Sequence, residues 1–402
     1  MKLIYVIIDG MGDRPIEELG GKTPLEVAET PYMDSLANAG KTGLMYTVGK
    51  GMAPESDVAV VSILGYDPFK YHVSRGALES VGAGLEMKSG DLALRCNFGT
   101  LGDDYKSILD RRAGRNLSQK EADELANAIN EEIKLETHSV ELKIKSTYTY
   151  RAALVIRSKE GKLSGNISNT DPAYKRINSV GVADLEAEMV MKTCYALDKT
   201  EEAKKSANLV NEFTLKATSV LDKHEVNKKR IKAGKLKANV ILSRDAGSSV
   251  PKFPSLKELY GLYFVCLADM NVERGISKLA GMSLVDLPPP SKDLENDCKL
   301  RVKRLLEALP HYDCFYVHIK GPDEPGHDGD FNLKTELTAI VDKHFVGNML
   351  QQINLEDHII CITADHSTPC DLKAHSDDPV PVLIAGNKLK GDKVKKFSEK
   401  DC

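Results

Sequence analysis

The sequence has no long hydrophobic segment. No window approaches the roughly 20 apolar residues that a membrane-spanning helix requires. The apolar run at residues 3–8 ends at Asp9 and Gly10, and it lacks the longer apolar region and the small-residue cleavage site of a signal peptide. We therefore expect a cytoplasmic protein with no membrane partner.

Two further absences exclude other classes of protein. The net charge is only -4, so the molecule as a whole is not built to neutralise nucleic acid. The eight cysteines are scattered without a C-x-x-C pair, which argues against a thiolate zinc site and against a disulfide framework. Any anion-binding site must come from local clusters of basic residues.

Both ends of the chain alternate strand and helix patterns. The run LIYVII at 3–8 is typical of a strand buried on both faces. Helical patterns follow at about 24–39 and 58–64. Near the C-terminus, the segments DCFYVHI, HIICITA and PVPVLIAG are predicted strands, and LKTELTAIVDKHFVGNMLQQI is a predicted helix. This alternation predicts an α/β fold with a parallel sheet and helices on both faces.

The middle of the chain has a different sequence pattern. It contains alternating strand-like segments, a charged helical segment SQKEADELANAINEEI and a long polar helix at about 201–224. The most basic run, KKRIKAGKLK, is expected to be a solvated linker. We predict an inserted α+β domain at 85–282, and a core domain formed by 1–84 plus 283–402.

Three C-terminal motifs carry acidic residues and histidines, and two of them directly follow predicted strands. They are DEPGHD at 323–328, TADHS at 363–367 and KAHSDD at 373–378. In an open α/β sheet, functional side chains collect at the carboxyl ends of the strands. We therefore expect Asp9, Asp323 and Asp365 to converge at one edge of the sheet. The same motifs contribute three histidines, which are His327, His366 and His375.

Carboxylates and imidazoles without thiolates suit zinc, manganese or cobalt better than calcium or a structural zinc. Two such ions about 4 Å apart can stabilise the attacking and the leaving oxygen of a phosphoryl transfer. A single aspartate at a strand end would more simply be a turn former or a helix cap. The whole set, at the ends of strands in one predicted sheet, favours a metal centre.

Ser56 is the candidate nucleophile. It stands at the start of the helical pattern that begins near 58, in a favoured N-cap position. A helix N-terminus offers backbone N–H groups to phosphate, and a serine hydroxyl needs a base or a metal to become reactive. The simpler alternative is that Ser56 only caps the helix.

Arginines are the candidates for binding anionic groups of a substrate, because the guanidinium group binds carboxylate or phosphate in a bidentate manner. Ordinary surface ion pairing is the alternative for each of them. The candidates are Arg95, Arg111, Arg112, Arg115 and Arg244.

The sequence resembles a known family in a series of motifs. They are IIDGMGDRP, TPYMDSLA, PESDVAV, RGALESVGAGL, RCNFGT, DRRAGR, SNTDP, GPDEPGHDGD and TADHSTPC. In these motifs the chain resembles the archaeal-type 2,3-bisphosphoglycerate-independent phosphoglycerate mutases of the alkaline phosphatase superfamily. The resemblance runs from residue 1 to the end of the sequence, with the motifs in family order.

The resemblance implies residue roles. Ser56 corresponds to the phosphorylated nucleophile. One metal ion would be held by Asp9, Ser56, Asp365 and His366, and the other by Asp323, His327 and His375. Manganese is expected first, with zinc, cobalt or magnesium as alternatives. The resemblance does not assign a general base, for which Asp245, beside Arg244, and Asp171 are two candidates.

The resemblance also implies the reaction. The substrates would be 3-phosphoglycerate and 2-phosphoglycerate, interconverted through phosphoserine in glycolysis and gluconeogenesis. The insert would bind the substrate and exclude water. The oligomeric state, and any continuation beyond Cys402, stay open.

Two alternatives use the same residues differently. A phosphatase or phosphodiesterase, or a mutase for another phosphosugar, would share the metals and the nucleophile, and a hydrolase would release inorganic phosphate. A non-catalytic relative would have lost a ligand or the nucleophile, whereas all seven expected positions are filled here.

Overall fold

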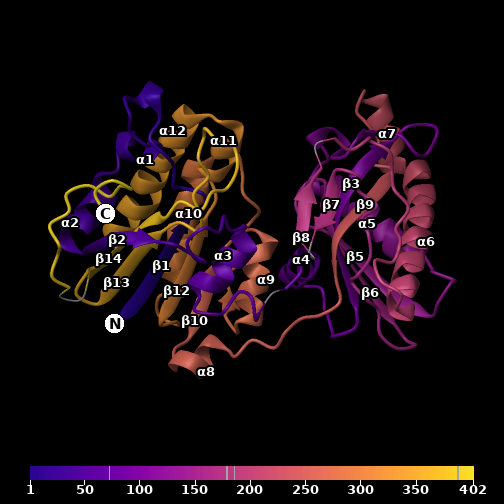
Figure 1. The fold of residues 1–402 in the computed structure, drawn as a ribbon, viewed down its shortest axis with the longest axis horizontal. Helices are drawn as coiled ribbons and strands as arrows, with labels where there is room; N and C mark the ends of the chain where they lie inside the picture. The colour runs from indigo at the N-terminus through magenta and orange to yellow at the C-terminus, as the bar shows by residue number, and fades with distance from the viewer. Residues whose placement is uncertain (72, 178–179, 185, 387–388) are drawn as a thin grey trace. The chain divides into compact units, whose positions relative to one another are not determined.

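The computed structural model describes residues 1–71, 73–177, 180–184, 186–386 and 389–402 (Figure 1). The chain forms two compact units, which are Met1–His72 with Lys252–Cys402, and Val73–Pro251. Within the described ranges, no helix is both long enough and apolar enough to span a membrane.

The first unit contains a sheet and its surrounding helices. Its strands are β1 (Lys2–Ile8), β2 (Lys41–Met45), β10 (Phe264–Leu267), β11 (Ser283–Leu284), β12 (Cys314–Ile319), β13 (His358–Thr363) and β14 (Val380–Gly386). Its helices are η1 (Glu17–Leu19), α1 (Pro24–Val27), α2 (Pro31–Ala39), α3 (Ser56–Ile63), α8 (Leu256–Tyr260), α9 (Asn271–Leu279), α10 (Leu294–Ala308), α11 (Asp323–Asp328), α12 (Phe331–Val341), η3 (Asp342–Gly347) and α13 (Asn348–Leu350).

The second unit contains the remaining elements. Its strands are β3 (Leu92–Leu101), β4 (Ile108–Asp110), β5 (Val140–Ser146), β6 (Arg151–Ser158), β7 (Tyr174–Ile177), β8 (Val180–Ala183) and β9 (Val240–Gly247). Its helices are α4 (Arg75–Gly82), η2 (Ala113–Arg115), α5 (Gln119–Glu132), α6 (Glu201–Lys223) and α7 (Glu225–Lys232).

The sheet of the first unit has seven strands in the order β11-β10-β12-β1-β13-β14-β2 (Figure 1). The strands from β11 to β13 are parallel, whereas β14 and β2 pair antiparallel at one end. The predicted α/β fold class is confirmed. The expectation that PVPVLIAG joins as a parallel strand is wrong, and β2 lies in a short polar segment that gave no strand pattern.

Burial of both faces of β1 explains its continuous apolar run. Ile4, Val6 and Ile8 belong to one large core cluster with residues of α2, α10 and η3. Ile7, on the other face, is also fully buried. A central parallel strand covered on both faces needs apolar side chains at every position.

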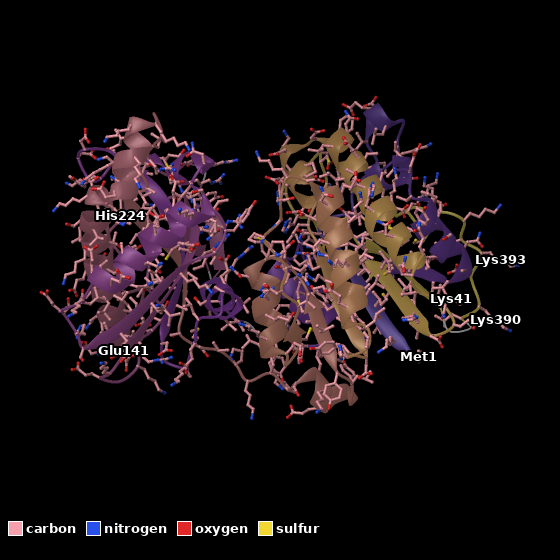
Figure 2. All side chains as sticks on the ribbon, turned by 180° about the vertical axis from the view of Figure 1, so that it is seen from behind. Met1, Lys41, Glu141, His224, Lys390 and Lys393 are labelled. Carbon is pink, nitrogen blue, oxygen red and sulfur yellow. The ribbon has the colours of Figure 1, made fainter. Side chains whose placement is uncertain are left out.

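The sheet ends in the edge strand β2, and charge protects this edge. Lys41 opens β2 and is exposed, as are Lys390 and Lys393 in the C-terminal segment. Figure 2 shows all three side chains directed to solvent. Exposed lysines discourage an edge strand from pairing with another chain.

The second unit is built on an antiparallel sheet in the order β4-β3-β6-β5, with β9 paired to β3. Residues of α5 and α6 join this sheet in a separate core cluster. The units divide near 72 and 251, not at the predicted 84 and 282, because β10 pairs with β12 in the first unit while α4 packs on β3 and β9. The role of this unit as a substrate-binding lid stays a prediction.

The basic run KKRIKAGKLK is not a solvated linker. Residues 228–232 belong to α7, and Arg230 has an exposed fraction of only 1%. Its guanidinium group donates to the carbonyl oxygens of Ala113 and Leu236 and to the side-chain oxygen of Asn116. Arg230 thereby fixes the DRRAGR loop, and this tertiary role is invisible in the charge pattern.

We predict that Arg230→Ala lowers the free energy of unfolding by roughly 2–4 kcal/mol, because buried carbonyl groups lose their donors and a cavity forms. Chemical denaturation followed by circular dichroism measures the change. Lys229→Ala, which removes an exposed charge from the same helix, serves as the control. Equal stability of the two variants would contradict the buried anchoring role.

Candidate active site

Three parallel strands deliver acidic side chains to one edge of the first unit's sheet. Asp9 directly follows β1, Asp365 lies two residues beyond β13, and Asp323 opens α11 after β12. The register pairs Ile8 with Ile319, so β1 and β12 end level. The structure brings the three aspartates together.

Gly10 permits this close approach. Its φ of +60° lies in the left-handed region, and a Cβ atom there would lie 2.7 Å from Cα of Asp323. Any other residue at this position would combine backbone strain with a steric clash against the loop that carries Asp323.

The first group of candidate ligands contains Asp323, His327 and His375. The Nε2 atoms of the two histidines lie 3.2 Å apart. Each of these nitrogens is 3.5 Å from Oδ1 of Asp323. The spacing of D-x-x-x-H on α11 places Asp323 and His327 one helical turn apart, on the same face.

The second group surrounds the Nε2 atom of His366. This atom lies 3.1 Å from Oγ of Ser56, 3.4 Å from Oδ1 of Asp9 and 3.3 Å from Oδ2 of Asp365. The ring of His366 stacks on that of His375 with centroids 3.7 Å apart, so the two groups adjoin.

Ser56 is the first residue of α3, and the N-cap is Glu55. The predicted N-cap position of Ser56 is therefore wrong by one residue. Ser56 is buried, and its hydroxyl is turned to His366. Capping alone does not account for this position.

Backbone carbonyl groups fix the tautomers of two histidines. Nδ1 of His327 lies 3.1 Å from the carbonyl oxygen of Lys373, and Nδ1 of His375 lies 2.9 Å from that of Pro54. A carbonyl oxygen only accepts, so each Nδ1 carries the proton. When both rings are neutral, their Nε2 lone pairs face each other, and that arrangement requires a shared proton or a cation.

The donor set fits divalent metal ions. Oδ1 of Asp9 and Oδ2 of Asp365 are buried without a hydrogen-bond partner. Buried polar atoms are nearly always satisfied, so these oxygens point to a missing ligand. Together with the imidazole nitrogens, they form an oxygen- and nitrogen-rich set without thiolate, as manganese, zinc or cobalt prefers.

Three residues of this site escaped the sequence prediction. Lys320 donates to Oδ2 of Asp9 at 2.7 Å and to Oε1 of Glu273 at 2.9 Å. His318 lies 3.9 Å from a carboxylate oxygen of Asp9 and 3.8 Å from one of Glu273. The sequence VHIK at the carboxyl end of β12 alternates apolar and polar residues, and this pattern could have identified His318 and Lys320 as candidates. Glu273 on α9 fell within the segment assigned to the insert.

Burial and neighbouring charges give the carboxylates of Asp9 and Asp365 different pKa values. Burial would raise the pKa of Asp9, but Lys320 and His318 lower it well below the usual value. Burial and the charge of Asp9 raise the pKa of Asp365 to about 7. In the metal-free site Asp9 is therefore ionised near neutral pH, whereas Asp365 is about half protonated.

The pKa values of His366 and His375 are shifted in opposite directions as well. Burial and the charge of His375 lower the pKa of His366 to about 3. Burial would lower the pKa of His375, but Asp323 and Glu55 outweigh it and raise the pKa to about 9. His366 is thus neutral near pH 7, which is the form in which an imidazole binds a metal ion.

All five predicted arginines lie in the second unit, and two of them share one carboxylate. Arg111 binds Asp171 through Nε at 2.7 Å and Nη2 at 2.6 Å, and Arg244 reaches the same carboxylate at 3.1 Å. Both guanidinium groups lie over the ring of Tyr174. Arg95 lies opposite Arg244 on the neighbouring strand, pairs with a carboxylate oxygen of Glu79 at 2.8 Å, and lies 3.7 Å from a carboxylate oxygen of Asp245.

Arg112 and Arg115 lie with Arg111 around a cavity of about 320 Å³ in the same unit. Ala113, Gly114 and Arg115 all have positive φ, so the loop presents its side chains in an unusual backbone conformation. Neither Arg112 nor Arg115 forms an ion pair with a residue that the structure describes. Their guanidinium groups are available to an anion.

The two candidates for a general base, Asp171 and Asp245, differ in their burial and contacts. Asp171 is fully buried, and its oxygens accept from Arg111, from Arg244 and from the N–H of Ala173. Asp245 has a φ of +55°, and its carboxylate lies 3.7 Å from a nitrogen of Arg244 and 3.7 Å from a nitrogen of Arg95. The position of Asp171 suits it to hold the arginines, and Asp245 stays the more available carboxylate.

Known proteins match the chain along its whole length. A family model for 2,3-bisphosphoglycerate-independent phosphoglycerate mutase matches residues 37–227. Relatives of that name from Aeropyrum pernix and Methanosphaera stadtmanae are 43% and 41% identical, covering 100% of this chain and 94% and 92% of theirs. The chain belongs to this family.

A solved structure agrees with the family assignment. The cofactor-independent phosphoglycerate mutase from Thermoplasma acidophilum is 29% identical and aligns with a TM-score of 0.63. The alignment covers 100% of this chain and 94% of that protein. Both units therefore correspond to parts of a family member of nearly the same length.

We predict that the affinity for Mn²⁺ rises with pH. Ligands must be deprotonated, and in the metal-free site Asp365 (pKa about 7) and His375 (pKa about 9) carry protons that Mn²⁺ has to displace. The affinity should climb by up to about tenfold per pH unit for each displaced proton and level off above about pH 9. Calorimetry in buffers of different ionisation enthalpy counts the released protons. Affinity independent of pH, with no proton release, would contradict this assignment.

Proposed function

We propose that this protein interconverts 3-phosphoglycerate and 2-phosphoglycerate without 2,3-bisphosphoglycerate, through a phosphoserine at Ser56. The observation that carries the proposal is the grouping of Ser56 with Asp9, Asp365 and His366, directly beside a second group of ligands. Family membership supports the choice of substrate. We further infer a cytoplasmic enzyme of glycolysis and gluconeogenesis.

Two divalent ions, Mn²⁺ before Zn²⁺, Co²⁺ or Mg²⁺, would supply Lewis-acid charge to the phosphoryl oxygens and lower the pKa of the serine hydroxyl. Asp9, Ser56, Asp365 and His366 would hold one ion, and Asp323, His327 and His375 the other. The two groups adjoin through the stacked rings of His366 and His375.

The chemical steps are two transfers of one phosphoryl group. Ser56 loses its hydroxyl proton as Oγ bonds to phosphorus, and the bond from phosphorus to the glycerate oxygen breaks as that oxygen takes up a proton. Glycerate reorients, and its other hydroxyl reverses these steps. Exclusion of water during reorientation preserves the phosphoserine.

The arginines of the second unit are proposed to bind the anionic groups of the substrate. Arg112 and Arg115 line a cavity that also includes Asp110, and neither of them forms an ion pair with a described residue. Arg111 and Arg244 are ordered by Asp171, and Arg95 by Glu79. Contacts between arginine and an anionic group are worth roughly 1.5–3 kcal/mol each.

The direct test is a coupled assay of 3-phosphoglycerate conversion. We expect conversion without added 2,3-bisphosphoglycerate, loss of activity on chelation and recovery with Mn²⁺. Inorganic phosphate should form far more slowly than product. Phosphate release as fast as isomerisation would make the protein a phosphatase, and full activity in excess chelator would overturn the role of metals.

We predict that Ser56→Ala lowers kcat by at least about a thousandfold, because no phosphoserine can form. The fold should persist, since among the described residues the substitution removes one side-chain hydrogen bond, to His366. Ser62→Ala, on the same helix, is the control and should keep normal activity. Mass spectrometry of substrate-trapped wild type should find phosphate on Ser56, and phosphate reproducibly on another residue would refute the assignment.

We predict that Arg115→Ala raises the ratio of phosphate release to isomerisation, because weaker binding lets glycerate escape before the second transfer. Mn²⁺ binding should be unchanged, since Arg115 belongs to the other unit. Lys120→Ala removes an exposed charge from the same unit as a control. Loss of mutase activity with no rise in that ratio would show that Arg115 does not retain glycerate.

A further inference from the structure

One hydroxyl group contacts a candidate ligand from each group. Thr368 is fully buried and lies two residues beyond His366. Its Oγ1 atom is 2.8 Å from Oδ1 of Asp323 and 3.0 Å from Nδ1 of His366. Asp323 belongs to the first group of ligands, and His366 is the centre of the second.

Hydrogen-bond chemistry fixes the direction of both bonds. An ionised carboxylate only accepts, so the single hydroxyl proton of Thr368 goes to Asp323. The same oxygen must then accept from His366, which places the proton of His366 on Nδ1. The lone pair of His366 is therefore on Nε2, the atom that faces Ser56.

The backbone of Thr368 is anchored from two sides. Its N–H donates to the carbonyl oxygen of Gly12 at 3.0 Å. Its carbonyl oxygen accepts from Nζ of Lys334 at 2.8 Å. Lys334 is itself fully buried, and its other bonds go to Gly12 at 2.9 Å and to Asp13 at 2.8 Å. All three ammonium donors are used, so Lys334 ties the loop after β1 to the loop after β13.

Space around this anchor is also restricted. A Cβ atom on Gly326, in α11, would lie 2.5 Å from the carbonyl oxygen of Thr368. The loop after β13 therefore packs closely against the helix that carries Asp323 and His327. The hydroxyl of Thr368 has little freedom to leave its two partners.

We infer that Thr368 is a positioning residue that couples the two ligand groups, by orienting Asp323 and by holding His366 in the tautomer that presents Nε2 to a metal ion. This inference rests on the proposed metal-dependent function. Outer partners of this kind commonly change metal affinity by about 10–100-fold when they are removed.

The test compares Thr368→Val with Thr368→Ser and with the matched control Thr338→Val. Thr338 is similarly buried, but its hydroxyl donates to the backbone carbonyl of Lys334 and contacts none of the candidate ligands. Mn²⁺ titrations of the metal-free proteins should show both binding events weakened by about 10–100-fold in Thr368→Val. Thr368→Ser, which keeps the hydroxyl, and Thr338→Val should bind like the wild type.

A second measurement reports on the tautomer without metal. In ¹⁵N NMR spectra of the metal-free wild type, His366 should be protonated on Nδ1, and in Thr368→Val the Nε2-protonated form should gain population. Unchanged affinity and tautomer in Thr368→Val, or weakening of one binding event alone, would overturn the coupling. A wild type that bound no Mn²⁺ would overturn the proposed function as well, which distinguishes the two failures.

Discussion

The ending of three adjacent parallel strands within one residue of each other is the constraint on which the site depends. Strands β12, β1 and β13 lie side by side, and each is followed by a segment that carries an aspartate. Parallel pairing directs all three carboxyl ends to one edge. A change of register would separate Asp9 from Asp323 and Asp365, and no later adjustment of side chains could restore the grouping.

Concentrating carboxylates in a buried place carries an electrostatic cost, and the protein offsets it with its own cations. Lys320 binds one oxygen of Asp9 and leaves the other without a partner. Buried charges persist only when they are paired or bind metal. In the resulting site the charge of Asp9 is balanced by Lys320, while one oxygen of Asp9 and one of Asp365 stay free to bind a metal ion.

The sequence predicted the parts of this site that follow strands directly. The sheet and the aspartates at its edge followed from apolar runs and their ends. Ser56 and the histidines were candidates from their positions in the sequence, and their assignment to two metal ions, which follows from the family resemblance, stays a prediction. It could not predict Glu273 or the anchoring of Thr368 by Lys334, because these contacts join segments distant in the chain. The burial of Arg230 could not be predicted either, because the sequence of a basic helix such as α7 does not show which of its basic side chains is buried.

The central claim is that the adjoining ligand groups hold two metal ions. Anomalous diffraction from crystals grown with Mn²⁺ tests it most directly. The account predicts two peaks about 4 Å apart, one bound by Asp323, His327 and His375, and the other by Asp9, Ser56, Asp365 and His366. A single peak, or a peak elsewhere with these side chains unligated, would contradict the account.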